Sequence, residues 1–338
     1  REGVLILDQQ MRVIASNPAA RNIFENVEGA LEGKRLTEVT RAPAIHNAFR
    51  ATLESDERAE AKIEMLDNAR RTFELHVVPL RVLYDAAQSG AIGVFFDITR
   101  LEHLERVRQE FFSNVSHELR TPLTAIIAYT ETLEDGAMLD QENNRRFLQI
   151  IRKNAARMHS LIDDILELST IEAGNAPLAP EQVKLSSLVS DIKTALASRA
   201  DERGVLVHNE VAAERTVYAD PRRLEQMLTN LIDNAIKFNR EGGSVKITLD
   251  QERDAARDRI SITDTGDGIS PEHLERIFER FYRVDRARSR ALGGTGLGLA
   301  IVKHLARAHG GEIMVQSKSG EGTTFTIELP AAPHDSET

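Results

Sequence analysis

The sequence predicts a multidomain α+β protein built from three parts. Its 338 residues exceed the length of a single typical domain. Strand-like runs alternate with helical segments over residues 1–99, a helical periodicity covers residues 100–173, and strands again alternate with helices over residues 178–332. We therefore expect an N-terminal α/β domain, an antiparallel helical hairpin and a C-terminal α/β sandwich.

The first part contains short apolar runs that are typical of strands. GVLILD opens it, and RTFELHVVPLRV and AIGVFFDIT follow a helical middle. Asn17 before Pro18 is the pattern of a helix start, because asparagine caps the first turn and proline suits the first helical position.

The second part reads as two long helices. From Arg100 the apolar residues recur at three- and four-residue steps, at Leu101, Leu104, Val107, Phe111, Val115, Leu119, Leu123 and Ile126. EDGAMLDQE interrupts this pattern, and a second amphipathic helix follows over about residues 141–173. Two helices with one apolar stripe each cannot enclose a core, so we expect a homodimer in which two hairpins form a four-helix bundle.

The third part follows a Gly/Pro/Asn hinge, AGNAPLAPE. Its helices include PRRLEQMLTNLIDNAIKFN, which begins at a proline, and a second proline-started segment, SPEHLERIFERFY. A glycine-rich loop leads into LGLAIVKHLARAHG, and two strand-like runs close the part.

Composition excludes several classes of function. The net charge is -10, which argues against direct nucleic-acid binding, because phosphate backbones are held by clustered Lys and Arg. The chain has no cysteine, so a disulfide framework and a thiolate zinc site are excluded. No apolar run is long enough to cross a bilayer. We expect a cytoplasmic chain, with any tether to the inner face of the cell membrane lying in a segment before residue 1.

The glycine-rich loop predicts a phosphate site. Gly294, Gly296 and Gly298 let the backbone approach a ligand closely, and the helix that follows offers free N–H groups to an anion. The loop lacks the Lys-Ser/Thr pair of a P-loop and does not follow the first strand of a dinucleotide fold. Taken alone, it is equally compatible with an ordinary surface loop.

Two further segments carry groups that suit a nucleotide. Asn230, Asn234 and Lys237 fall on one helical face, where amide oxygens can ligate Mg²⁺ and the lysine can meet a phosphate. In DTGDGI, Asp264 ends a strand and offers an acceptor to an exocyclic amine, while Gly266 and Gly268 admit a flat base. Each segment by itself is equally compatible with a polar helix face or a strand-ending turn.

Together these segments and FERFYRVD resemble the N, G1, F and G2 boxes of the Bergerat-fold ATPases, which include sensor histidine kinases, chaperones and type II topoisomerases. The resemblance covers roughly residues 178–332 and implies ATP and Mg²⁺ as cofactors. It implies that Asp264 holds the adenine amino group, Asn234 the Mg²⁺ and Lys237 a phosphate. It also implies that Arg283 reaches the γ-phosphate and that Thr323 supports the adenine pocket.

The stretch SHELRTPL carries a candidate nucleophile. The neutral imidazole of His117 can attack phosphorus, and Glu118 can orient the ring and stabilise the developing cation. Pro122 removes a helical hydrogen bond to the carbonyl of residue 118 and can bend the helix. The stretch resembles the H-box of HisKA-type sensor histidine kinases. That resemblance implies a protein histidine kinase in which His117 is autophosphorylated and passes the phosphoryl group to an aspartate of a response regulator, while Thr121 orients a hydrolytic water.

Residues 1–99 resemble a PAS domain, and the whole chain is similar to kinases of the phosphate-sensing kind. The alternative for this part is a generic α/β dimerisation module, and His46 or His76 is a candidate haem ligand. Two rival functions remain open for the chain. One is an ATP-driven clamp without a phosphoenzyme, and the other is a scaffold whose ATP site has decayed.

Overall fold

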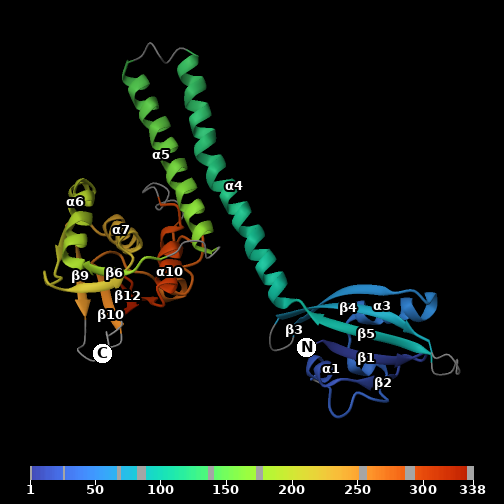
Figure 1. The fold of residues 1–338 in the computed structure, drawn as a ribbon. Helices are drawn as coiled ribbons and strands as arrows, with labels where there is room; N and C mark the ends of the chain where they lie inside the picture. The colour runs from blue at the N-terminus through green and yellow to red at the C-terminus, as the bar shows by residue number, and fades with distance from the viewer. Residues whose placement is uncertain are drawn as a thin grey trace, which may run out of the picture. The chain divides into compact units, whose positions relative to one another are not determined.

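The structure is a computed structural model that describes residues 2–25, 27–66, 70–81, 89–135, 141–172, 178–250, 257–285 and 294–332. The chain divides into two compact units, Arg1–Ser113 and Asn114–Thr338. The predicted interruption in EDGAMLDQE and the hinge AGNAPLAPE lie largely outside the described residues. The predicted α/β domain, helical hairpin and α/β sandwich are all present, which confirms the predicted fold class (Figure 1).

A five-stranded antiparallel sheet forms the basis of the first unit, with strand order β2-β1-β5-β4-β3. The strands are β1 (Gly3–Asp8), β2 (Val13–Ser16), β3 (Ala59–Leu66), β4 (Arg70–Leu80) and β5 (Gly90–Asp97). The first and last strands pair from Gly3↔Phe95 to Asp8↔Gly90. The final strand therefore lies inside the sheet, and the chain leaves the domain from there.

Three helices accompany this sheet: α1 (Pro18–Ile23), α2 (Leu36–Val39) and α3 (Pro43–Ser55). The predicted cap of α1 is confirmed, because the Asn17 side chain accepts a hydrogen bond from the Ala20 N–H at 2.8 Å. The core is packed with aromatic side chains from Phe24, Phe49, Phe73 and Phe95. Gly93 leaves room for one of them, since a Cβ there would lie 2.3 Å from Phe49 Cζ. His46, the candidate haem ligand on α3, directs its Nε2 to the Thr40 carbonyl oxygen at 2.8 Å.

The exit from the sheet is tied to the helix that follows, α4 (Thr99–Glu134). Asp97 accepts hydrogen bonds from the backbone N–H of Thr99 at 3.0 Å and from its hydroxyl at 2.5 Å. The same hydroxyl accepts from the Thr72 N–H on β4 at 2.9 Å. A change in the sheet would therefore reach the start of α4 through short polar contacts.

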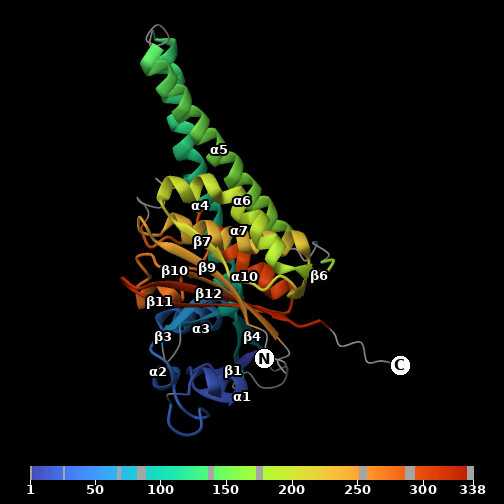
Figure 2. The same ribbon diagram turned by 90° about the vertical axis from the view of Figure 1, so that its left-hand side faces the viewer.

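The helices α4 and α5 (Gln141–Glu172) lie side by side as an antiparallel hairpin (Figures 1 and 2). α4 continues through Pro122 without interruption. Apolar side chains remain exposed along the pair in the single chain, at Phe112, Leu123, Ile127, Leu148, Ile162 and Leu166. Among the described residues, no helix combines the length and apolar character required for a membrane span.

The α/β sandwich contains a second five-stranded sheet, ordered β11-β12-β10-β9-β7, in which only the β7–β9 pair is parallel. Its strands are β7 (Leu206–Asn209), β9 (Ser244–Asp250), β10 (Arg257–Asp264), β11 (Glu312–Lys318) and β12 (Gly322–Pro330). β6 (Glu181–Lys184) and β8 (Thr216–Ala219) pair separately. Figure 2 shows one face of the main sheet covered by α6 (Leu185–Arg203), α7 (Pro221–Lys237) and α10 (Gly298–Ala308).

The helix expected over SPEHLERIFERFY is shorter than predicted. Only α8 (Pro271–Leu274) is helical, and turns follow it, such as the one closed by the Glu279 N–H on the Arg276 carbonyl at 2.8 Å. Phe281 has a left-handed φ of 62° and its N–H donates to the Gly296 carbonyl at 2.8 Å. The helix ends early because its residues turn to hold the glycine-rich loop, which periodicity alone does not reveal.

The hairpin packs against the sandwich through α5 and α10. Leu161 and Leu168 on α5 are buried, with exposed fractions of 3% and 1%. Burial of two leucines is a substantial apolar contribution, of about 1.5–3 kcal/mol each. This packing places the middle of the hairpin beside the start of α10.

Candidate functional site

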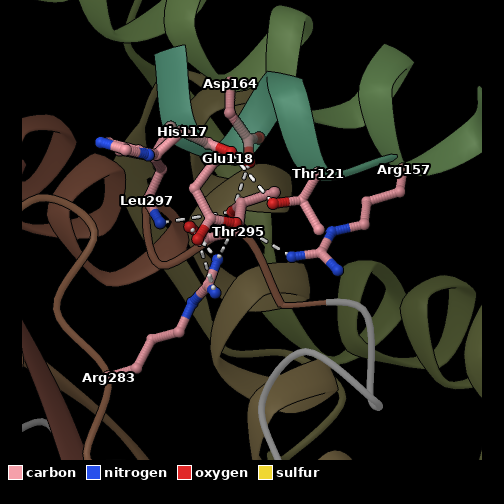
Figure 3. Close-up of polar contacts among 8 residues, drawn as sticks. All are labelled: His117, Glu118, Thr121, Arg157, Asp164, Arg283, Thr295 and Leu297. Atoms are coloured by element: carbon pink, nitrogen blue, oxygen red, sulfur yellow. Dashed lines mark hydrogen bonds and ion pairs between the residues drawn. The ribbon is translucent and has the colours of Figure 1, made fainter. Parts of the chain in front are cut away.

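His117 lies on α4 with its ring exposed (Figure 3). The ring makes no hydrogen bond with any residue in the described part of the chain. One turn later, the Thr121 hydroxyl donates to the His117 carbonyl oxygen at 3.2 Å. A solvent-exposed imidazole without a fixed partner is accessible to a second molecule or domain, as a phosphoacceptor must be.

Glu118, the neighbour of His117, points toward two arginines (Figure 3). Arg157 on α5 donates to Glu118 Oε2 at 3.0 Å. Arg283, in the segment after α8, donates through Nη1 to Oε1 at 3.2 Å and through Nη2 to Oε2 at 3.1 Å. The two planar groups therefore meet in the bidentate geometry that gives strong ion pairs. Glu118 is the residue expected to orient His117, and Arg283 is the residue expected at the γ-phosphate. In this structure the two are bound to each other.

Arg283 and Glu118 are both largely shielded from water, since their side chains are 4% and 17% exposed. Arg157 is also 17% exposed. Removing Glu118 leaves two arginines without this carboxylate, and an uncompensated buried charge costs about 3–5 kcal/mol. The sequence contained no signal for Arg157, because it lies on an ordinary amphipathic helix and meets Glu118 only through folding.

Thr295 connects the glycine-rich loop to both hairpin helices. Its carbonyl oxygen accepts from Arg283 Nη2 at 2.7 Å, and its hydroxyl donates to Asp164 on α5 at 2.7 Å (Figure 3). The same hydroxyl accepts from the Leu297 N–H, just before α10, at 3.3 Å. Burial raises the pKa of the Asp164 carboxyl, and the Thr295 hydrogen bond opposes this rise. Sequence reasoning missed Thr295 and Asp164, because neither belongs to a motif that specifies this contact.

All three predicted glycines of the loop, Gly294, Gly296 and Gly298, lie within the described residues. Gly296 has a φ of +79°, and a Cβ there would lie 2.9 Å from Phe281 Cα, so a side chain would fit neither the backbone nor the space. A Cβ on Gly298 would lie 3.6 Å from Asn230 Cγ. The structure therefore brings the loop next to the asparagine-bearing helix α7.

The three predicted residues of α7 are all partly buried. Lys237 forms an ion pair with Asp233 one turn earlier at 2.6 Å, so its ammonium already has a carboxylate partner. Asn234 has no side-chain hydrogen bond to any described residue, and its amide oxygen is therefore available to a ligand. No group of three or more acidic, histidine or cysteine side chains that could hold a metal ion occurs among the described residues.

Asp264 ends β10 and is buried, with 8% of the residue exposed. One carboxylate oxygen accepts from the Gly266 N–H at 2.8 Å and from the Thr323 N–H at 3.2 Å. Burial raises the pKa of the Asp264 carboxyl, and these backbone donors oppose the rise. Since both donors bind Oδ1, the other oxygen remains for an exocyclic amine.

Glycines around Asp264 allow neighbouring backbone segments to approach closely. A Cβ on Gly266 would lie 2.6 Å from the Phe238 carbonyl oxygen, and one on Gly268 would lie 2.1 Å from the Lys318 carbonyl oxygen. Thr323 further shares a hydroxyl contact of 2.8 Å with Ser317. Asp264, Gly266, Gly268 and Thr323 thus lie together at one edge of the sheet, where β10 and β11 end and β12 begins.

Comparisons with known families agree with this arrangement. Residues 1–103 match the model of the PAS fold, and residues 107–174 match the His Kinase A (phospho-acceptor) domain. Residues 219–333 match the Histidine kinase-, DNA gyrase B-, and HSP90-like ATPase model. The three matches follow one another along the chain and cover most of it.

Individual relatives extend the same likeness. The sensor protein SrrB of Staphylococcus aureus strain NCTC 8325 is 33% identical over 329 residues, which are 97% of this chain and 54% of SrrB. The chain thus spans about half the length of that relative.

Two solved structures share the fold. Full-length ShkA in complex with AMPPNP is 33% identical over 66% of this chain and 46% of ShkA, with a TM-score of 0.50. The histidine kinase ThkA, in complex with the response regulator protein TrrA, covers 98% of this chain and 96% of its own, with 24% identity and a TM-score of 0.54. At that identity the ThkA likeness concerns the fold alone.

Three observations point to one family: an exposed histidine on a helical hairpin, a buried aspartate among glycines at a strand end, and matches along the chain to the PAS, phospho-acceptor and ATPase models. The chain belongs to the sensor histidine kinases.

Proposed function

We propose that this chain is an ATP-dependent protein histidine kinase that phosphorylates itself on His117 and then passes the phosphoryl group to an aspartate of a response regulator. One observation carries this proposal. Arg283, from the ATP-binding part, contacts Glu118 beside His117. Arg283 is the residue expected to contact the γ-phosphate. It is thus bound to the neighbour of His117, the residue expected to receive that phosphate.

The transfer step requires an in-line displacement at the γ-phosphorus. A lone pair on one ring nitrogen of His117 forms the N–P bond, while the bond from phosphorus to the β,γ-bridging oxygen breaks. Its electron pair leaves with ADP, and the second ring nitrogen releases its proton to a base. Glu118 suits that base once Arg283 moves from the carboxylate to the γ-phosphate, because the carboxylate then loses a bidentate cationic partner while Arg157 still orients it.

ATP would bind between α7 and the glycine-rich loop, with its adenine against Asp264, Gly266, Gly268 and Thr323. The AMPPNP bound to ShkA supports the choice of nucleotide. The available oxygen of Asp264 and its shielding from water suit recognition of an amino group. Gly294, Gly296 and Gly298 would line the phosphates.

Mg²⁺ would bind through Asn234, with Asn230 beside it. The donor set fits this ion, since the Asn234 side chain has no hydrogen-bond partner among the described residues and a neutral amide leaves room for phosphate oxygens and water. When bound, the ion supplies neutralisation of phosphate charge. Lys237 would add a point charge on a phosphate after leaving Asp233.

A phosphatase activity toward the regulator is a further part of this proposal. Thr121 lies one turn after His117 on an exposed helix surface, and its hydroxyl currently donates to the His117 carbonyl. A hydroxyl with this weak backbone bond can turn outward and orient a water against a phosphoryl-aspartate. Kinase and phosphatase residues would then share one helix surface.

The proposed assembly is a cytoplasmic homodimer that docks its regulator on the hairpin. Exposed apolar side chains along α4 and α5 support pairing with a second copy, because a lone hairpin cannot bury them. We divide the chain at 1–99 for the sensor domain, 100–173 for the signalling helix and phosphotransfer hairpin, and 178–332 for the ATP-binding domain.

Incubation of the chain with γ-labelled ATP tests the proposal. We expect acid-labile, alkali-stable label that is absent from the His117→Ala variant. ATP consumption without label would instead indicate a clamp-type ATPase, and neither label nor consumption would indicate a scaffold.

A further inference from the structure

Three acidic residues of α5 face the ATP-binding part, and they contact different features of it. Glu167 accepts hydrogen bonds from Arg223 and Gln226 of α7. Glu172, at the end of α5, accepts from Arg280. Asp164 contacts the glycine-rich loop itself, through the Thr295 hydroxyl. Glu167 therefore holds the body of the domain, Glu172 holds the segment after α8, and Asp164 holds the loop that would surround the phosphates.

The Asp164–Thr295 contact is built into the packed interface. Asp164 lies between the buried leucines Leu161 and Leu168 on the same helical face. It is partly buried, and its carboxylate accepts from Thr295 at 2.7 Å, a short distance typical of a charge-assisted hydrogen bond. Apolar packing on both sides limits the competition from water.

Besides its hydrogen bond to Asp164, Thr295 makes two further contacts. Its hydroxyl accepts from the Leu297 N–H and so sets the start of α10. Its carbonyl oxygen accepts from Arg283, which is thereby held at Glu118, the residue that directly follows His117. Without the Asp164 acceptor, the Thr295 hydroxyl would lose its fixed partner. The Thr295 carbonyl, which holds Arg283, could then change its orientation.

We propose that Asp164 is a positioning residue for autophosphorylation. Through the Thr295 hydroxyl it aligns the glycine-rich loop and Arg283 with the hairpin, so that the terminal phosphate is presented at His117. The inference rests on the proposed kinase function. It assigns to α5 a role in the chemistry besides packing, since an error of about 1 Å in such an alignment costs about a hundredfold in rate.

The test compares rates of His117 labelling at saturating ATP in the full chain. Asp164→Ala and Thr295→Val remove the acceptor and the donor, and each is expected to lower the maximal rate about tenfold or more. The KM for ATP should stay within about twofold, because neither change removes a group that contacts the nucleotide. Asp164→Asn and Thr295→Ser retain an acceptor and a hydroxyl and should restore most of the rate.

Asp163→Ala is the matched control. It removes a carboxylate one residue earlier on the same helix, but Asp163 is exposed and pairs with His159. We expect its labelling rate to equal that of the unmodified chain. Sedimentation and circular dichroism of each variant would show whether the dimer and the fold persist.

The outcomes separate the inference from the proposed function. If the unmodified chain does not label His117, the kinase proposal fails. If it does, equal or higher maximal rates in Asp164→Ala and Thr295→Val, or a change in KM alone, would overturn the positioning role.

A second measurement does not depend on activity. Because the chain has no cysteine, a cysteine pair at positions 164 and 295 can be joined by a short bismaleimide without background. Efficient intramolecular cross-linking, absent from a pair at 163 and 295, supports the contact, and equal yields from the two pairs would overturn it.

Discussion

Glu118 and Arg283 are joined by two hydrogen bonds of 3.2 and 3.1 Å, although 165 positions separate them in the chain. One belongs to the hairpin and directly follows the candidate phosphoacceptor, and the other belongs to the segment that precedes the glycine-rich loop. Because both side chains are largely shielded from water, removing one partner costs more than breaking a surface ion pair, whose contribution is about 0–1 kcal/mol. We propose that Arg283 exchanges this carboxylate for the γ-phosphate when ATP binds.

Arg283→Ala tests this exchange. We expect a loss of autophosphorylation of about a hundredfold or more, the size associated with removing one preorganised donor from developing charge. The measurement is the initial rate of His117 labelling. Arg276→Ala is the control, because Arg276 is exposed and contacts Glu279 and the Tyr282 ring rather than Glu118. Equal losses in the two variants would contradict a specific role for Arg283.

Asn234→Ala tests the assignment of the metal-binding amide. We expect nucleotide-dependent labelling to be abolished, because no other described side chain on that helix face replaces the lost oxygen at the same place. Calorimetric titration with ADP should show that the gain in affinity on adding Mg²⁺ disappears. The dimer should persist in sedimentation, and its loss would argue against separate folding of the hairpin and the ATP-binding part.

Thr121→Ala tests whether the kinase and phosphatase activities depend on different residues of α4. The variant should autophosphorylate normally, because the hydrogen bond of the Thr121 hydroxyl within the described part of the chain goes to a backbone carbonyl. Dephosphorylation of the regulator should fall about tenfold or more. Loss of label from a phosphorylated regulator measures it. Thr124→Ala offers a control on the same helix, since Thr124 makes an equivalent bond to the Arg120 carbonyl at 2.9 Å. Unchanged phosphatase activity in Thr121→Ala would remove the proposed role.

Nucleotide affinity should depend on the charge of Asp264. Burial raises the pKa of this carboxyl, so it takes up a proton at a higher pH than an ordinary aspartate. Since the carboxylate is the better acceptor for an amino group, ADP affinity should fall as the pH drops through the raised value. In Asp264→Asn this part of the pH dependence should vanish, whereas the titration of the ADP phosphates is common to both proteins. Identical pH profiles would contradict adenine binding by Asp264.

The same raised pKa has a consequence for folding with a defined sign. The folded state binds this proton more tightly than the unfolded state, so Asp264 contributes stability below its unfolded pKa and loses that contribution as the pH rises through the folded value. The Asp264→Asn variant should therefore gain stability relative to the unmodified chain at neutral pH.

Gly268→Ala should destabilise the ATP-binding part more than Gly320→Ala. Both glycines have a positive φ, of 69° and 82°, which costs about 1–2 kcal/mol for alanine. At Gly268 a Cβ would also lie 2.1 Å from the Lys318 carbonyl oxygen, whereas nothing lies within 4 Å at Gly320. The collision should add about 1–3 kcal/mol. Urea unfolding of the full chain followed by circular dichroism measures the difference, and equal stabilities would contradict the close packing.

Much of the architecture was predictable because it depends on local patterns. The three parts follow from the change between strand alternation and helical periodicity, and the Asn17 cap follows from one asparagine before a proline. The residues gathered near Asp264 were predictable as well, because glycines beside a strand end must serve a close backbone approach. The residue roles assigned from these motifs stay predictions.

The sequence by itself determined which side chains are available for phosphoryl transfer: an imidazole beside a carboxylate, amides one helical turn apart and a glycine-rich loop. Only the tertiary structure decided which of them meet. The Arg283–Glu118 ion pair and the Asp164–Thr295 hydrogen bond both depend on how α10 packs against α5. Contacts between residues more than a hundred positions apart are set by that packing, and no local periodicity or propensity encodes them.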